Sequence, residues 1–415
     1  MIEPQATKDI KITFNRETLR KLGPAFVLAS VTIGPGSVIL SVMNGALFEY
    51  KMVWLLVLSG IFMAFYCEMF TRIAIVSKET VWQTIRRKYG VPLGILGGIM
   101  GFVTSICYHT GNITATGASL GTMFGGNIAV WSTSMTILAI IFILFKGLYK
   151  KIEYFVLGVI LLMLLGFIGT LAITGFSVGG AAKGLVPTFP STQAIFLGMA
   201  MMATFFSLNA SIFQSYLVKE KKYQIKDLSN ARLDAYSGVV TMAIILLVIL
   251  FVAANVLHPQ KIIPSSPADM AKQLEPLAGA FAHYLFGFGL FAAAFSSLII
   301  NSIAGGVFLA DGLGKSASFD DKFVKMLSIL VIVIAWVISM IPMLLNVNAV
   351  NAIVVAQAVS IIGLPYYGWV ALKLGNDKEI LGNFTNTKAR NVMIGLGYLL
   401  SLAVAIYYAY SIFFS

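Results

Sequence analysis

Residues 30–45 read Ser-Val-Thr-Ile-Gly-Pro-Gly-Ser-Val-Ile-Leu-Ser-Val-Met-Asn-Gly. Apolar residues lead into this stretch and out of it, and together they form a segment long enough to cross a bilayer. Pro35 has no backbone donor, and the glycines beside it, Gly34 and Gly36, add backbone freedom. We therefore predict a helix that is broken near the middle of the membrane. Because lipid cannot hydrogen-bond the freed backbone groups, they must line a cavity or a site, as in the broken helices of many secondary transporters.

The composition is that of a helical membrane protein. Of the 415 residues, 58% are hydrophobic and only 11% are charged, and the mean hydropathy is +0.88. The apolar runs are continuous and do not alternate with polar residues, so they predict helices and not the strands of a barrel. We expect a segment at 1–21 in the cytoplasm and a single all-α transmembrane domain at 22–415. Its eleven predicted spans are 22–48, 52–76, 94–122, 130–147, 154–174, 192–218, 236–257, 277–310, 326–345, 350–373 and 392–414.

The basic residues predict the orientation. With the N-terminus in the cytoplasm, 25 of the 29 Lys and Arg residues fall in segments on the inner side. This bias is the one that cytoplasmic loops show, so we expect a multi-pass protein of the cytoplasmic membrane with its C-terminus outside. The same bias accounts for the net charge of +12 without a nucleic-acid partner. Only four basic residues fall on the outer side: Lys51, Lys183, Lys261 and Lys272.

The sixth predicted span also has a polar middle, between Thr204 and Ser211. Interruptions in the first and sixth spans are what an inverted five-plus-five repeat would bring together at the centre of the membrane. The alternative is that Ser207, Asn209 and Ser211 only form hydrogen bonds between helices.

Several stretches, in the same order along the chain, resemble the Nramp (natural resistance-associated macrophage protein) family of divalent-metal transporters, which has a LeuT-like fold. Gly34-Pro-Gly-Ser resembles the Asp-Pro-Gly-Asn break of that family's first helix. The resemblance implies interrupted first and sixth helices, and it identifies the chain as a divergent member. The other matching stretches are Leu22-Gly-Pro-Ala, Thr71-Arg-Ile-Ala-Ile-Val-Ser, Lys146-Gly-Leu-Tyr-Lys-Lys-Ile-Glu-Tyr-Phe-Val, Gly184-Leu-Val-Pro-Thr-Phe-Pro-Ser, Ala356-Gln-Ala-Val-Ser-Ile-Ile-Gly-Leu-Pro and Asp377-Lys-Glu-Ile-Leu-Gly-Asn-Phe-Thr-Asn.

The resemblance also implies where a substrate would bind. The family holds its metal with the Asp and Asn of the first-helix break, the Met of a Met-Pro-His motif in the sixth helix, and a nearby carbonyl. Of the residues at these positions, Ser37, Ser207 and Asn209 are the candidate metal ligands. The expected substrate-binding residues are Gly34 and Ser37 in the first helix, Thr204, Ser207 and Asn209 in the sixth, and the retained glutamine of the tenth, Gln357.

Three further positions match the family's proton pathway. His109 and Asn112 replace two acidic residues of the third helix, and Gln214 replaces a second histidine of the sixth. An imidazole titrates near physiological pH, so His109 is a candidate proton carrier. The alternative is a neutral histidine bonded to a neighbouring carbonyl.

The chemistry of the substituted positions favours a hard ion. A transition metal at the midplane prefers at least one anionic ligand, and a thioether adds selectivity for softer ions. Gly34 and Ser207 supply neither. Neutral hydroxyl and amide groups can contact a hydrated Mg²⁺, which keeps most of its water. We therefore expect Mg²⁺ to be favoured over Mn²⁺ or Fe²⁺, and tight Mn²⁺ binding to be absent.

These observations predict a secondary active transporter that works by alternating access, with protons as a candidate coupling ion. No enzyme motif and no cofactor site is recognisable, so neither is expected. Two alternatives remain open: a transporter of a non-metal solute or anion on the same scaffold, and a membrane receptor that does not transport. Outside the site, we expect a structural ion pair between Glu68 and Arg72, a solvated Asp311, and a packing role for Asn301.

Overall fold

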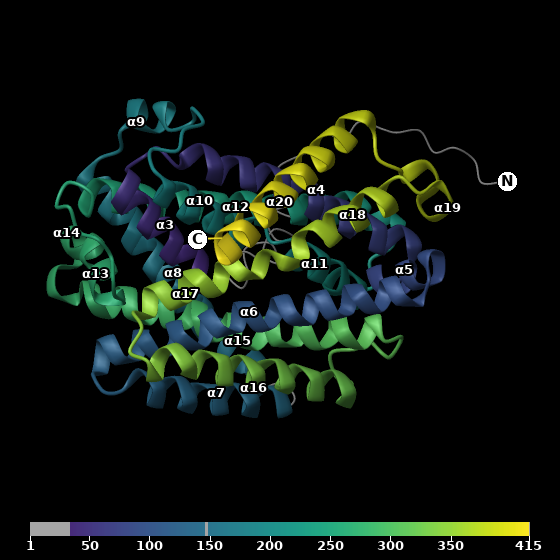
Figure 1. Ribbon diagram of the computed structural model, residues 1–415, viewed down its shortest axis with the longest axis horizontal. Coiled ribbons are helices and arrows are strands. Elements are labelled where there is room, and N and C mark those ends of the chain that lie inside the picture. The colour runs from purple at the N-terminus through teal and green to yellow at the C-terminus, as the bar shows by residue number, and fades with distance from the viewer. Residues whose placement is uncertain (1–33, 146–147, 415) are drawn as a thin grey trace.

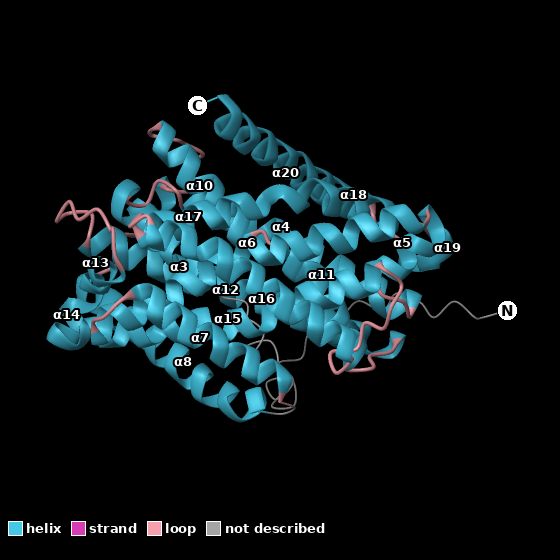
Figure 2. Cartoon of the chain, turned by 60° about the horizontal axis from the view of Figure 1, so that its bottom comes forward, coloured by secondary structure: helices cyan, strands magenta, loops and turns pink. Residues whose placement is uncertain are grey.

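The computed structural model describes residues 34–145 and 148–414, and within these ranges every regular element is a helix (Figure 2). The predicted segment 1–21 and the first half of the first span lie outside the described residues. Eight helical stretches are long and apolar enough to cross a membrane, and three shorter apolar helices accompany them. Together they occupy the positions of the predicted spans.

The helices that correspond to the uninterrupted spans follow the predicted ranges closely. The largest difference is in α12, which begins at Leu228 and not at residue 236, because the polar turn before the apolar run is also helical. These helices are α4 (Val53–Ser77), α6 (Val91–Phe124), α7 (Ile128–Leu144), α8 (Leu148–Thr174), α12 (Leu228–Val256), α15 (Ala282–Gly312), α16 (Lys322–Leu344) and α20 (Lys388–Phe414).

The predicted break in the sixth span is present. The span consists of α10 (Thr192–Phe205) and α11 (Leu208–Glu220), separated at Phe206 and Ser207. The Ser207 hydroxyl caps α11 by accepting a hydrogen bond from the amide of Ala210 at 3.3 Å. In the first span, α3 (Pro35–Phe48) begins at the predicted break, after Gly34 in an extended conformation. Proline is well suited to the first position of a helix, where its missing N–H costs nothing.

The tenth span is interrupted as well, which we did not predict. It consists of α17 (Ala349–Val359), a 3₁₀ turn at Ser360–Gly363, and α18 (Leu364–Gly375). Pro365 explains the change in winding, because proline cannot donate to the carbonyl four residues earlier and its ring clashes with that carbonyl in a continuous helix.

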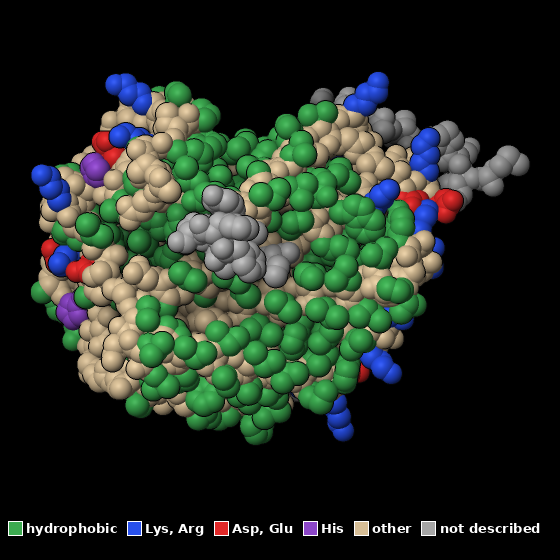
Figure 3. All heavy atoms as spheres, viewed as in Figure 1, with side chains coloured by type: hydrophobic (Ala, Val, Ile, Leu, Met, Phe, Trp, Pro, Cys, Tyr) green, Lys and Arg blue, Asp and Glu red, His purple; other side chains and the backbone are tan. Residues whose placement is uncertain are grey.

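The connecting helices gather at the two ends of the bundle (Figure 1). Connections predicted to be cytoplasmic, α5 (Val81–Tyr89) and α19 (Lys378–Leu381), lie at one end. Connections predicted to be outside, α9 (Val178–Lys183), α13 (Pro267–Ala271) and α14 (Glu275–Ala278), lie at the other. The surface between the ends is largely apolar, and most of the Lys and Arg side chains in view lie at the α5 and α19 end (Figure 3). We call this the basic end.

Glycines allow the central helices to pack backbone against backbone. A Cβ atom on Gly98 of α6 would lie 2.7 Å from the carbonyl oxygen of Phe308 in α15. A Cβ atom on Gly45 of α3 would lie 2.2 Å from the carbonyl oxygen of Leu250 in α12. Small residues at such crossings are the usual means by which membrane helices approach closely. The position of α3, and of the break at its start, therefore depends on Gly45.

We predict that Gly45→Ala destabilises the protein, because the added methyl group meets a backbone atom that cannot rotate away. The expected loss is about 1–3 kcal/mol, the usual cost of overpacking. Thermal unfolding in detergent measures it as a lower melting temperature. Gly395→Ala in α20 is the matched control, since a Cβ atom there meets nothing within 4 Å. Equal melting temperatures for the two variants would contradict this packing.

Candidate functional site

The interrupted helices meet at a small internal cavity. Its volume is about 40 Å³, enough for roughly three water molecules. Both α3 and α11 begin at this cavity, and α10 ends there. The lining residues come from six membrane spans: Gly34, Gly36, Ser37, Tyr108, Asn112, Thr204, Phe205, Ser207, Asn209, Ala210, Phe213, Met242, Asn301, Ala304 and Gln357.

The helix ends give the cavity a polar backbone surface. The first amides of α3 and α11 have no partner inside their own helices, and each helix N-terminus carries a partial positive charge. The end of α10 contributes free carbonyl oxygens and a partial negative charge. The cavity therefore offers both donors and acceptors before any side chain is considered.

Tyr108 connects α6 to the break in the sixth span. Its hydroxyl lies 3.2 Å from the carbonyl oxygen of Ala203 and 3.2 Å from the hydroxyl of Ser207. One contact is made with the last turn of α10 and the other with the cap of α11. Tyr108 thus spans the interruption and helps to fix the distance between the two half-helices.

Asn209 is held from two sides. Its side-chain amide donates to the hydroxyl of Ser105 in α6 at 3.3 Å, and its side-chain oxygen accepts from Tyr367 in α18 at 3.4 Å. Asn209 therefore forms hydrogen bonds between helices, as the alternative interpretation of the sixth span proposed. It also lines the cavity.

Gln357 is clamped between two glycines. A Cβ atom on Gly36 would lie 2.4 Å from the side-chain Cδ of Gln357, and one on Gly111 would lie 2.7 Å from its Nε2. Only residues without a side chain leave room for the amide at these two positions. The start of α3 and the middle of α6 thus hold the Gln357 amide at the wall of the cavity.

The structure brings together all six of the expected substrate-binding residues: Gly34, Ser37, Thr204, Ser207, Asn209 and Gln357 line the one cavity. The proton-pathway candidates are divided. Asn112 lines the cavity, whereas His109 and Gln214 do not. His109 is fully buried, neither ring nitrogen makes a hydrogen bond of good geometry, and the backbone of Leu298 in α15 lies beside the ring.

Among the lining residues that were not expected at the site, three carry a polar group or a sulfur atom: Tyr108, Asn301 and Met242. Tyr108 precedes Asn112 by four residues and so lies on the same face of α6. This helical spacing could have indicated that Tyr108 belongs to the site. Asn301 of α15 lines the cavity, although a packing role was expected. Met242 of α12 had no signal, because a methionine in an apolar helix is ordinary. Its thioether supplies the only sulfur among the lining residues.

No charged side chain lines the cavity among the residues that the structure describes. Among the described residues, no group of three or more His, Cys, Asp or Glu side chains could hold a metal ion. Any ion in this cavity would therefore meet hydroxyl groups, amides, backbone groups and one thioether.

The ionisable groups Glu68, Arg72 and Asp311 lie towards the basic end. The predicted Glu68–Arg72 ion pair is confirmed, with Nε of Arg72 3.1 Å from the carboxylate. The expectation for Asp311 was wrong, because its side chain is buried and not solvated. Asp311 accepts hydrogen bonds from the hydroxyl of Thr80 at 2.8 Å and from the hydroxyl of Tyr216. The carboxylate thus joins α15 to the cap of α5 and to α11, which removes it from water.

A family model described as "Natural resistance-associated macrophage protein-like" matches residues 25–411. The chain belongs to the Nramp family. Curated relatives named divalent metal cation transporter MntH cover nearly the full length. The one from Chromohalobacter salexigens is 23% identical over 94% of this chain and 91% of its own, and the one from Bacillus subtilis is 21% identical over 97% and 95%. The expectations of a transporter and not an enzyme are thereby confirmed.

Solved structures support the fold. A crystal structure of the Eremococcus coleocola manganese transporter superimposes with a TM-score of 0.80 at 17% identity, over 96% of this chain and 87% of that one. MHP1, a nucleobase-cation-symport-1 family transporter, superimposes with a TM-score of 0.64 at 12% identity, over 95% and 93%. This Nramp-family chain therefore has a LeuT-like fold, and its cavity lies where the interrupted helices of that fold meet.

We predict that Gly36→Ala destabilises the protein chiefly by displacing Gln357. The added Cβ atom would overlap the Gln357 side chain, so shortening that side chain should relieve the overlap. A double-mutant cycle of Gly36→Ala and Gln357→Ala, read by thermal unfolding, measures the coupling. The loss caused by Gly36→Ala should be smaller in the Gln357→Ala background. An equal loss in both backgrounds would mean that the two residues are not in contact.

Proposed function

We propose that this Nramp-family chain is a secondary active transporter of divalent metal cations that favours a hard ion such as Mg²⁺ over Mn²⁺ and Fe²⁺. The family and its relatives' names support the first part. The uncharged lining of the cavity supports the second, and it is the observation on which the proposal depends.

The ligand chemistry of the cavity is the reason for this preference. Mn²⁺ and Fe²⁺ gain most from anionic oxygen, imidazole or sulfur ligands, and the lining offers only the Met242 thioether. Mg²⁺ gives up its water reluctantly and is commonly bound through it. The hydroxyl groups of Ser37 and Ser207 and the amides of Asn209 and Gln357 suit such a shell, because they can accept hydrogen bonds from coordinated water. The volume of about 40 Å³ suits an ion with part of its water.

The expected mechanism is alternating access around the two breaks. We propose that α3 and α11 belong to two inverted five-helix repeats, with eleven helices crossing the membrane. We also propose that the basic end faces the cytoplasm. The gathering of the basic connections at that end supports this orientation. In this arrangement the substrate site lies between the repeats, and each state exposes it to one side of the membrane.

A small anion is the second candidate substrate. The observation in its favour is that two half-helices, α3 of 14 residues and α11 of 13, both begin at the same uncharged cavity. Amide groups at helix N-termini favour negative charge.

Uptake into proteoliposomes tests the proposal. We predict that purified protein accelerates Mg²⁺ entry over empty liposomes, and that Mn²⁺ enters more slowly and does not compete at equal concentration. Ca²⁺ and small anions complete the panel. Faster Mn²⁺ than Mg²⁺ entry would contradict the ion preference. Entry of an anion alone would favour the second candidate, and no entry of any solute would favour a receptor that does not transport.

We predict that Gly34→Asp gives the protein Mn²⁺ uptake. Of the described residues, only Ser297 would lie near a Cβ atom on Gly34, with its Oγ at 3.7 Å, so a side chain fits beside the cavity. The new carboxylate would supply the anionic ligand that the lining lacks. Gly34→Asn is the matched control, because it has the same shape without the charge. If both variants, or neither, gained Mn²⁺ uptake, the missing charge would not be what excludes Mn²⁺.

We propose His109 as the group that binds a coupling proton, since it is the only ionisable group of the expected pathway. Asn112 and Gln214 do not titrate, so they can only pass a proton through hydrogen bonds. We predict that uptake by His109→Ala loses its dependence on external pH. His283→Ala, at a half-buried histidine near the start of α15, should keep that dependence. Unchanged pH dependence in His109→Ala would remove His109 from this role.

A further inference from the structure

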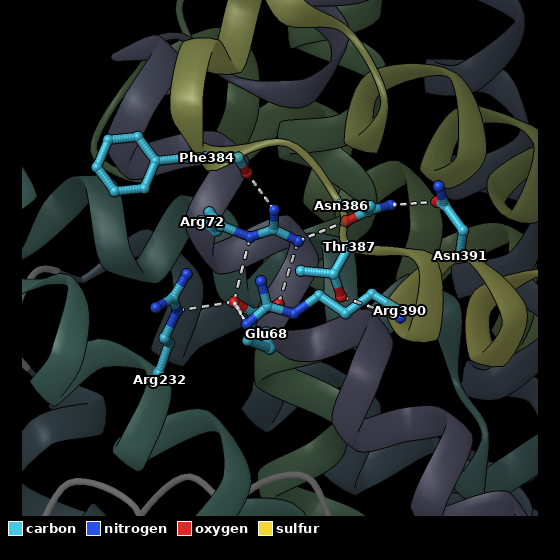
Figure 4. Close-up of polar contacts among 8 residues, drawn as sticks. All are labelled: Glu68, Arg72, Arg232, Phe384, Asn386, Thr387, Arg390 and Asn391. Atoms are coloured by element: carbon cyan, nitrogen blue, oxygen red, sulfur yellow. Dashed lines mark hydrogen bonds and ion pairs between the residues drawn. The ribbon is translucent and has the colours of Figure 1, made fainter. Parts of the chain in front are cut away.

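Three arginines from three helices converge on a single carboxylate at the basic end (Figure 4). Glu68 of α4 accepts hydrogen bonds from Arg72 of the same helix, at 3.1 Å, and from Arg232 of α12, at 2.8 Å. Arg390 of α20 forms an ion pair with the same oxygen at 3.5 Å. The Glu68 side chain is only 1% exposed. With three positive charges on one negative charge, the cluster carries an excess of two positive charges.

Arg72 is fully engaged within the protein. Its side chain is completely buried, and besides Glu68 it donates to the backbone oxygen of Phe384 and to the side-chain oxygen of Asn386 at 2.6 Å. Arg72 therefore serves to attach α4 to the segment before α20, and Glu68 neutralises it.

Arg232 has unused hydrogen-bond donors, whereas Arg390 also forms a hydrogen bond with the side chain of Tyr236. The side chains of Arg232 and Arg390 are 21% and 24% exposed. Arg232 uses only its Nε on Glu68, and its two terminal nitrogens have no partner among the described residues. Because the bonding nitrogens of both arginines lie within 3.5 Å of one oxygen, the two guanidinium groups are close enough to bind one anion together. Guanidinium groups bind phosphate oxygens in this forked manner.

The position of the pair identifies the kind of anion. Arg232 is the fifth residue of α12 and Arg390 the third of α20, so both lie within about 6 Å of the helix starts at 1.5 Å per residue. Beyond Arg232, the neighbouring face of α12 is apolar and exposed, with Val240 54% and Ile244 55% exposed. The exposed apolar residues of α20, Val392 and Leu399, lie on the side of that helix opposite Arg390. Positive charge at the membrane edge, with apolar surface running away from it, matches a phospholipid.

We propose that Arg232 and Arg390 bind the phosphate of an anionic phospholipid, whose acyl chains lie along α12. The lipid offsets the positive charge that Glu68 leaves unbalanced, and it holds together three helices that meet at this end of the bundle. This site is distinct from the substrate cavity, and the proposal does not depend on which ion is transported.

Native mass spectrometry of the full-length protein tests the proposal. Protein in detergent is mixed with phosphatidylglycerol or with phosphatidylcholine of the same acyl chains, and the bound lipids are counted. We predict preferential retention of phosphatidylglycerol, and a roughly tenfold weaker retention in Arg232→Gln/Arg390→Gln, as expected for the loss of charge-assisted hydrogen bonds. Arg87→Gln/Lys322→Gln, which removes two charges from the same end, should retain phosphatidylglycerol like the unchanged protein.

Two further measurements distinguish lipid binding from misfolding of the variant and from binding of free phosphate. Arg232→Lys/Arg390→Lys preserves the charge but not the forked geometry, so it should retain an intermediate amount of lipid even if the glutamine variant folds poorly. Inorganic phosphate, added without lipid, should not raise the melting temperature. Equal retention of the two lipids, equal loss in the control variant, or stabilisation by phosphate alone would overturn the assignment to a lipid.

Discussion

Unpaired backbone groups cannot be left facing lipid, and this constraint organises the whole molecule. The chain interrupts helices at Gly34–Pro35 and at Phe206–Ser207, and each interruption exposes amides or carbonyl oxygens at membrane depth. The fold answers by bringing both interruptions to one polar cavity, surrounded by long continuous helices. Close glycine crossings, such as Gly45 against α12, hold the interrupted helices at that place.

The cavity combines the Nramp scaffold with an uncharged lining. A carboxylate can neutralise a bare dication directly, whereas neutral oxygens stabilise it best through its own water. Such a site would favour an ion that is bound through its retained water, such as Mg²⁺, and its selectivity would not come from the softness of a ligand. The Gln357 amide is held in place, and the Tyr108 hydroxyl bridges the sixth-helix break. Together they give the lining a rigid geometry that can discriminate between ions.

Much of this arrangement could be predicted from the sequence. Long apolar runs fixed the helices within a few residues, Pro35 marked the start of α3, and the resemblance placed six residues at one site. Other features depend on three-dimensional neighbours. Asp311 seemed solvated because it ends a span next to a loop, yet Thr80 and Tyr216 come from distant segments to bury it. Met242 reaches the cavity only because α12 packs against α3, which no local pattern reveals. The 3₁₀ turn before Pro365 did have a signal, in the proline itself.

The central claim is that this Nramp-family scaffold does not hold a transition-metal site of the usual kind. The most direct measurement is a calorimetric titration of Mn²⁺ into the purified full-length protein, with the Gly34→Asp variant titrated in parallel. We predict no heat of binding in the micromolar range for the unchanged protein and a clear binding isotherm for the variant. Micromolar Mn²⁺ binding by the unchanged protein would contradict the claim, because the neutral lining would then suffice for a transition metal.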